Sequence, residues 1–154
     1  MYKRQLKKSV EPVVKLVEKE ALTAGIVISG KVPSDIWVYA DPDAVAEVLT
    51  NLLVNAVTHC PPGTRVLVSA EVHGKNAEIT VSDNGHGIPA DMLEQVFEPF
   101  VQADRKPGSG YRGVGMGLAV CKALIERMGG KIWAERNKEG GATFKFTLPI
   151  AKSQ

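Results

Sequence analysis

The chain has few cysteines, no long apolar run and little net charge. Its two cysteines, Cys60 and Cys121, have no neighbouring Cys or His at the spacing of a zinc site. We therefore expect both to be free thiols in a reducing compartment. A long-range disulfide remains the alternative, because spacing alone does not exclude it.

The missing apolar run and the small charge exclude two further classes of protein. No segment is long enough to span a bilayer, and the N-terminal residues MYKRQLKKS lack the apolar middle of a signal peptide. A net charge of +2 over 154 residues is too small for a basic nucleic-acid-binding surface. We expect a cytoplasmic, monomeric domain that is not inserted in a membrane, although the full-length protein could carry an anchor.

Apolar periodicity predicts helices mixed with hairpins. Residues 1–8 are expected to be the frayed end of a preceding element, outside the core. Ser9 is expected to cap a helix with Pro12 in its first turn, and Gly25 to end it. The apolar stripe of this helix would include Val13, Leu16, Val17 and Leu22.

The segment 41–60 has the strongest helical pattern, with Asp41 as cap and Pro42 at the first helical position. The remaining elements suggest helices packed on one face of a largely antiparallel sheet, which is an α+β fold. They are strands at 26–32 and 36–40, a hairpin of 64–72 with 76–83 turning at Gly74, a short helix near 90–96, a long mobile loop over 98–113, a helix at 114–130, and a hairpin of 131–137 with 142–149.

Asn51 and Asn55 lie four residues apart on the predicted helix, so their side chains share one side of it. Their neighbours are apolar, and an amide in such a surface needs a polar partner. One interpretation is a buried amide bonded to a loop carbonyl. The other is an amide oxygen that faces a cavity and binds Mg²⁺, which prefers oxygen ligands and retains waters.

The stretch DNGHGIP, residues 83–89, follows a strand that alternates apolar and polar residues. Asp83 is either a turn cap or the acceptor for an exocyclic amine, and the glycines allow close approach of a flat ligand.

In the stretch GYRGVGMGLA, glycines alternate immediately before a helix. Exposed amides at a helix start favour a phosphate site.

In this order, the segments NLLVNAVTH, DNGHGI, FEPF, GVGMGLA and GGATF resemble the N, G1, F, G2 and G3 boxes of the catalytic domain of bacterial sensor histidine kinases. The resemblance covers residues 9–150, leaving 1–8 as the remnant of a dimerisation helix or linker and 151–154 as a tail. It implies a two-layer α/β sandwich of the Bergerat type. A mixed, mostly antiparallel sheet would pack under about three helices, with ATP held beneath a mobile lid.

The resemblance also implies residue roles. Asn55 would bind Mg²⁺, Asn51 would lie on the phosphate side as a catalytic residue, and Asp83 would accept a hydrogen bond from the adenine amine. Thr143 would reach the same edge through water, and the phenylalanines of the F box would anchor the lid, residues 101–112. The nucleotide contacts implied are Asn55, His59, Asp83, Gly85, Gly87, Ile88, Phe97, Phe100, Arg112, Gly113, Val114, Gly115, Met116, Gly117, Leu118 and Thr143.

The sequence departs from its relatives at Thr58, where many have Lys or Arg facing the phosphates. We expect Arg112 to supply that charge as a catalytic residue, in preference to Lys106 or Arg105, because it adjoins the glycine run. His59 occupies a position that is often aromatic in the family, and it is equally suited to facing solvent.

Asn51 stands where water-splitting relatives have a glutamate base, and an amide accepts no proton at neutral pH. Glu47, one turn earlier, is expected to lie too far away to act as a base. This predicts slow hydrolysis of ATP and transfer to a nucleophile from elsewhere. The alternatives are an ATPase or anti-sigma serine kinase of the same superfamily, and a nucleotide-sensing module without transfer activity.

None of the three histidines, His59, His73 and His86, lies in a recognisable acceptor motif. We therefore expect an excised catalytic domain. Its partners would be its own dimerisation and phosphoacceptor domain and a response regulator receiver domain, with no nucleic acid.

Overall fold

The computed structural model describes residues 1–99 and 117–152. The elements in chain order are β1 (Tyr2–Gln5), α1 (Leu6–Thr23), β2 (Val27–Lys31), β3 (Trp37–Ala40), α2 (Pro42–His59), β4 (Arg65–His73), β5 (Asn76–Asp83), the 3₁₀ turns η1 (Ala90–Met92) and η2 (Gln95–Phe97), α3 (Gly117–Arg127), β6 (Ile132–Arg136) and β7 (Ala142–Pro149).

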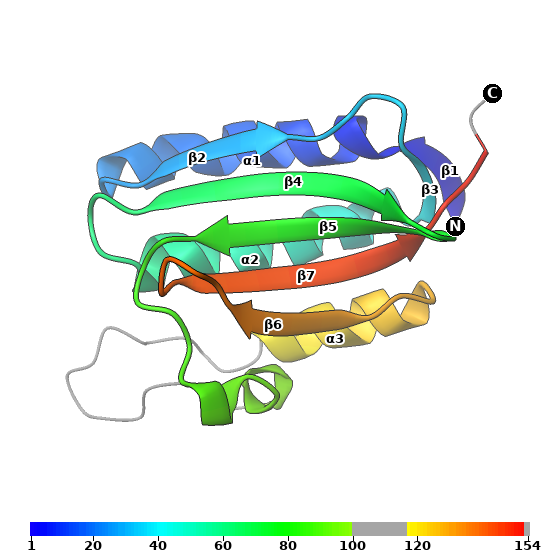
Figure 1. Ribbon diagram of the computed structural model, residues 1–154. Helices are drawn as coiled ribbons and strands as arrows, with labels where there is room; N and C mark the ends of the chain where they lie inside the picture. Colours follow the sequence, from blue (N-terminus) through cyan, green and yellow to red (C-terminus); the bar gives the residue numbers. More distant parts are fainter. Residues whose placement is uncertain (100–116, 153–154) are drawn as a thin grey trace.

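The main sheet of the described residues has five strands in the order β2-β4-β5-β7-β6. The β2–β4 pair is parallel and the other pairs are antiparallel. Figure 1 shows α1, α2 and α3 behind one face of this sheet, which we call the helix face. The fold is therefore the predicted α+β sandwich, with a mixed and mostly antiparallel sheet.

The core lies between the helix face and the helices because apolar residues alternate along the central strands. In β5, Ala77, Ile79 and Val81 are buried, while Glu78 and Thr80 between them are less buried. Successive strand residues point to opposite faces, so the residues between are on the other side, which we call the open face. Helix α2 contributes the predicted stripe, and its members Val45, Val48, Leu49, Leu52, Leu53 and Ala56 are all buried.

The prediction that residues 1–8 are a frayed end outside the core is wrong. β1 pairs antiparallel with β3, and α1 begins at Leu6 instead of at Ser9. Leu6 is fully buried and its amide donates to the carbonyl of Ile36 at 2.9 Å, so this contact fixes the start of the helix. Pro12 consequently lies inside the helix rather than in its first turn.

The apolar stripe of α1 also differs from the prediction. Leu16 and Leu22 are 74% and 59% exposed. The buried face instead follows the helical spacing of three and four residues from the N-terminal anchor. Its members are Leu6, Val10, Val13, Val14, Val17 and Ala21.

Several local predictions are confirmed. The carboxylate of Asp41 accepts from the amide of Asp43 at 2.9 Å, with Pro42 next to it at the helix start. The β4–β5 hairpin turns at Gly74.

The short helix expected near 90–96 is replaced by η1 and η2. Among the described residues, no helix combines the length and apolar character needed to cross a bilayer.

Candidate functional site at the end of β5

Asp83 ends β5 on the helix face, and only 9% of it is exposed. Its Oδ1 accepts two backbone hydrogen bonds, from the Gly85 amide at 2.9 Å and from the Ala142 amide at 3.2 Å. Both amides use the same carboxylate oxygen. The carboxylate is therefore held by the backbone, and neither amide uses its Oδ2.

Glycines allow the backbone to close around Asp83. A Cβ at Gly141 would overlap the carbonyl group of Asp83, and one at Gly87 would overlap the carbonyl oxygen of Gly140. Gly87 also has a positive φ of 78°, which side chains disfavour. The end of β5 and the β6–β7 turn are thus in direct backbone contact.

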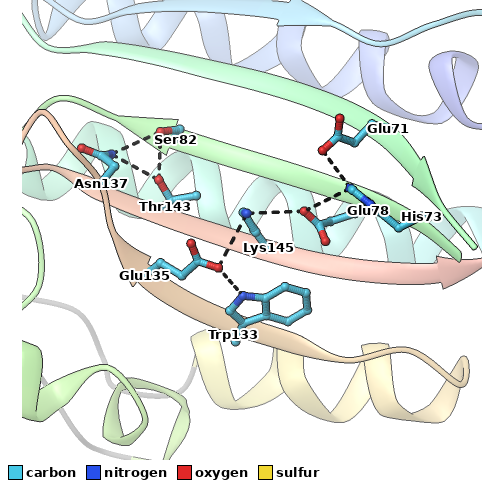
Figure 2. Close-up of polar contacts among 9 residues, drawn as sticks. All are labelled: Glu71, His73, Glu78, Ser82, Trp133, Glu135, Asn137, Thr143 and Lys145. Carbon is cyan, nitrogen blue, oxygen red and sulfur yellow. Dashed lines mark hydrogen bonds and ion pairs between the residues drawn. The ribbon is translucent and has the colours of Figure 1, made fainter.

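The sequence reasoning missed Asn137, which joins these two segments. Its side-chain Nδ2 donates to the Asp83 carbonyl at 2.8 Å, and its Oδ1 accepts from the amides of Gly141 and Glu139 at 3.0 and 3.1 Å. Figure 2 shows this amide beside Ser82 and Thr143. The only sequence signal was an Asn at the start of a Gly-rich turn, which is where such residues bond to nearby backbone.

Thr143 does not lie as predicted. Its hydroxyl forms a 3.0 Å hydrogen bond with Ser82, its register partner on β5, and a 3.2 Å one with Asn137 (Figure 2). Ala142 and Phe144 point toward the helices, so the residue between them points to the open face. At this position the helix face presents the amide and methyl group of Ala142 beside Asp83, and the Thr143 hydroxyl is on the other side.

Asn51 and Asn55 are both half-buried on α2. The Asn51 side chain faces the start of α3, since a Cβ on Gly117 would lie 3.8 Å from its Oδ1. At the C-terminal end of α2, the Cys60 thiol and the Asp83 carboxylate both border Gly85. Nine residues at 1.5 Å per residue separate Asn51 from Cys60, about 13 Å.

Cys60 is a second residue that sequence reasoning did not place in the site. Burial and the negative charge of the adjacent Asp83 raise the pKa of the Cys60 thiol to about 12. Cys60 and Cys121 are both free thiols, as predicted. No sequence pattern distinguished Cys60, because its neighbours in the chain, His59 and Pro61, only mark a helix end.

The other predicted residues surround this region or lie outside the described residues. Ile88 and Phe97 are buried, and Phe97 meets Phe144 edge to face with ring centroids 6.1 Å apart. His59 and Leu118 are half-buried, whereas Thr58 is exposed. The predictions for Phe100, Arg105, Lys106, Arg112, Gly113, Val114, Gly115, Met116 and the lid 101–112 fall outside the described residues.

A different group of side chains, of the types that can bind metal ions, lies at the far end of the sheet. Ligand atoms of Glu71, His73 and Glu78 lie within 4.8 Å of one another. The Lys145 ammonium is already 3.4 Å from Glu78 (Figure 2), so it supplies a competing positive charge. This group is on the open face, away from Asp83 and α2.

A buried carboxylate held by backbone amides at a sheet end, and an amide-bearing helix that leads to the start of another helix, fit a nucleotide-binding α+β domain. The family described as histidine kinase-, DNA gyrase B- and HSP90-like ATPase matches residues 40–152. The chain belongs to this family and is an ATP-binding catalytic domain of the histidine kinase type.

Known relatives agree with this assignment. The adaptive-response sensory kinase SasA of Synechococcus elongatus is 39% identical over 122 residues, which cover 77% of this chain and 31% of SasA. The chain thus spans less than a third of that relative. Full-length ShkA in complex with AMPPNP is 29% identical with a TM-score of 0.84, covering 99% of this chain and 31% of that one. Histidine kinase ThkA in complex with response regulator protein TrrA is 27% identical with a TM-score of 0.81, covering 97% of this chain and 42% of that one.

Proposed function

We propose that this domain binds Mg-ATP and transfers the γ-phosphoryl group to a histidine on a separate dimerisation and phosphoacceptor domain. A response regulator receiver domain would then take the phosphoryl group. The single observation that carries the proposal is the amide-held carboxylate of Asp83, joined by one face of α2 to the start of α3.

Asp83 would recognise the base. Its Oδ1 is occupied by two backbone amides, so Oδ2 is the oxygen that accepts a hydrogen bond from the adenine amine. A charge-assisted bond of this kind is stronger than one between neutral groups. Gly85, Gly87 and Ile88 would lie beside the ring, and Ala142 takes the edge position predicted for Thr143.

The phosphates would lie between α2 and the start of α3. Asn55 offers an amide oxygen to Mg²⁺, which needs few protein ligands when phosphates and waters complete its shell. Asn51 and the amides at Gly117 and Leu118 would face the phosphates. Arg112 remains the proposed source of positive charge in place of Thr58.

The chemistry is transfer rather than hydrolysis. An imidazole nitrogen of the acceptor attacks the γ-phosphorus, the bond to the β,γ-bridging oxygen breaks, and ADP leaves. Asn51 is an amide and accepts no proton at neutral pH, so it does not activate water. Glu47, one turn earlier on α2, is exposed at the helix surface.

The relatives support the partners. ShkA was solved with a nucleotide analogue and ThkA with a response regulator. We place the domain in the cytoplasm, where ATP is available, and propose that it is monomeric by itself.

The test is calorimetry with Mg-ATP on the 154-residue chain. We expect one site, weakened when Mg²⁺ is removed and weakened at least about tenfold by Asp83→Asn, because a hydrogen bond to a charged group is lost. Asp91→Asn is the control, since Asp91 is exposed in η1. Absence of binding heat, or equal affinities of Asp83→Asn and the wild type, would contradict the proposal.

Transfer is tested by adding a dimerisation and phosphoacceptor domain in trans and measuring acid-labile phosphate. Fast turnover of free ATP without transfer would favour an ATPase. Binding without either reaction would favour a nucleotide-sensing module, the alternative that the uncharged Thr58 supports. Unchanged affinity and transfer in Arg112→Ala would reject the role of Arg112.

A further inference from the structure

We propose that Cys60 is a positioning residue for purine recognition, with its thiol donating a hydrogen bond to the Asp83 carboxylate and fixing the direction of the oxygen that meets the base. This inference rests on the proposed function, because it assumes that Asp83 receives an adenine. It concerns a residue on α2 rather than one in the glycine-containing loop.

The local backbone brings the thiol to the carboxylate. Helix α2 ends at His59, and Cys60 is its C-cap residue, with extended dihedrals and its amide donating to the Ala56 carbonyl. The chain then turns away through Pro61 and Pro62, which have no amide hydrogen to continue the helix. The thiol is therefore presented at the helix end that faces the last residue of β5.

Gly85 shows how closely these groups converge. A Cβ at Gly85 would lie 2.8 Å from the Cys60 sulfur and 3.3 Å from Oδ1 of Asp83. The sulfur and the carboxylate thus border the same small space, which only a glycine leaves open. The carboxylate is also close enough for its charge to act on the thiol.

The protonation state suits a donor. Burial and the adjacent negative charge of Asp83 raise the pKa of the Cys60 thiol to about 12, so it carries its proton at neutral pH. The Thr64 hydroxyl donates to the Pro61 carbonyl at 2.7 Å and makes only a smaller, opposing contribution to that pKa.

Asp83 then has two kinds of restraint. The Gly85 and Ala142 amides hold Oδ1, and the thiol adds a third donor that opposes rotation of the carboxylate. A fixed acceptor favours adenine, whose exocyclic group is an amine. It disfavours guanine, which has a carbonyl oxygen at that ring position, because two acceptors would face each other.

The experiment measures ADP and GDP affinities of the 154-residue chain by calorimetry, with Cys60→Ala and Cys60→Ser as variants. The Cys60 thiol is one neutral hydrogen-bond donor to the Asp83 carboxylate, which keeps its two backbone donors. Removing the thiol corresponds to about a fivefold loss of ADP affinity. We expect that loss in Cys60→Ala, with a smaller ratio of ADP to GDP affinity. Cys60→Ser keeps a donor and should remain within about twofold of the wild type.

The matched control is Cys121→Ala, the other cysteine. Cys121 is fully buried between α2 and α3, and its thiol donates to the Val48 carbonyl at 3.7 Å. This variant loses a buried sulfur without touching Asp83, so its ADP to GDP ratio should be unchanged even if its melting temperature falls.

The ratio of ADP to GDP affinity, and its rescue by Cys60→Ser, are readouts that a purely structural role would not move. Wild-type affinity in Cys60→Ala, or an unchanged ratio of ADP to GDP affinity in that variant, overturns the role of Cys60 alone. Failure of the wild-type chain to bind ADP overturns the proposed function and this role together.

Discussion

Two carboxylates on β5 illustrate two ways of holding a charge. Glu78 lies near the hairpin end on the open face, 3.4 Å from the Lys145 ammonium and 3.9 Å from the His73 ring (Figure 2). Asp83 lies at the other end on the helix face, and its Oδ1 is bound by two backbone amides. One strand thus carries a charge met by long side chains and a charge met by the backbone.

The difference matters because long side chains move and backbone amides do not. Lys145 also approaches Glu135, at 3.6 Å, so it has an alternative partner if Glu78 is lost. Such partly exposed pairs contribute little to stability. The amides at Asp83 are fixed by a sheet and a tight turn, so their direction is set before a ligand arrives, which is what recognition requires.

The largest expected effect comes from separating the backbone segments around Asp83. In Gly141→Ala, the new Cβ overlaps the Asp83 carbonyl, and we expect a loss of about 3 kcal/mol in the free energy of unfolding. Urea denaturation measures this. Gly30→Ala is the control, because a Cβ on Gly30 meets its nearest atom at 3.9 Å; equal losses in both variants would contradict the close approach.

A smaller effect is expected from Asn137→Ala, which leaves the Asp83 carbonyl and the Gly141 amide without their side-chain partner. The free energy of unfolding should fall by about 2 kcal/mol, and nucleotide affinity should fall with it as the turn loosens. Lys138→Ala, at an exposed position in the same turn, provides the comparison by urea denaturation. If both variants are equally stable, Asn137 does not hold the turn.

The core between α2 and α3 also contains a buried thiol, Cys121, whose effect on stability depends on pH. Burial raises the pKa of the Cys121 thiol from 9.0 to about 12. Above pH 9 the unfolded chain loses this proton while the folded chain keeps it, so stability falls as pH rises toward 12.

At pH 10 the Cys121 contribution is a loss of about 1 kcal/mol relative to pH 8. Cys121→Ala should be less stable at every pH, but its decline between pH 8 and 10 should be shallower than that of the wild type. Urea melts at both pH values test this, and parallel pH profiles for the two proteins would rule it out.

The smallest effect is expected on the open face. Glu78→Gln removes a charge from the pair with Lys145, and the free energy of unfolding should change by less than about 1 kcal/mol. High salt should reduce that difference further. A loss of unfolding free energy as large as that of Asn137→Ala would mean that the two ends of β5 are held equally firmly. It would contradict the difference between Glu78 and Asp83.

The elements that the sequence predicted well are those whose pattern is local. The α2 stripe, the Asp41 cap and the β4–β5 hairpin each depend on residues within a few positions of one another. The direction of Thr143 was also readable, because Phe144 and Phe146 must face the core and Thr143 alternates with them. It was assigned instead by resemblance, which names positions without giving the side of the sheet.

The N-terminal segment failed for the opposite reason. Its apolar content is low, but Leu6 meets Ile36, which lies 30 positions further along the chain, and β1 pairs with β3. Periodicity within residues 1–8 contains no information about that pairing. The roles of the phosphate-side residues outside the described part of the chain, including Arg112, stay predictions.

By itself, the sequence determined the class of fold, the family and the identity of the acidic residue at the end of β5, because these follow from local periodicity and from motifs in a fixed order. Only the tertiary structure decided that Asn137, 54 positions away, and Cys60 at the end of α2 are the residues around that carboxylate. The physical reason is that hydrogen bonds between distant segments depend on how helices and strands pack together, and packing geometry is not encoded in any short stretch of chain.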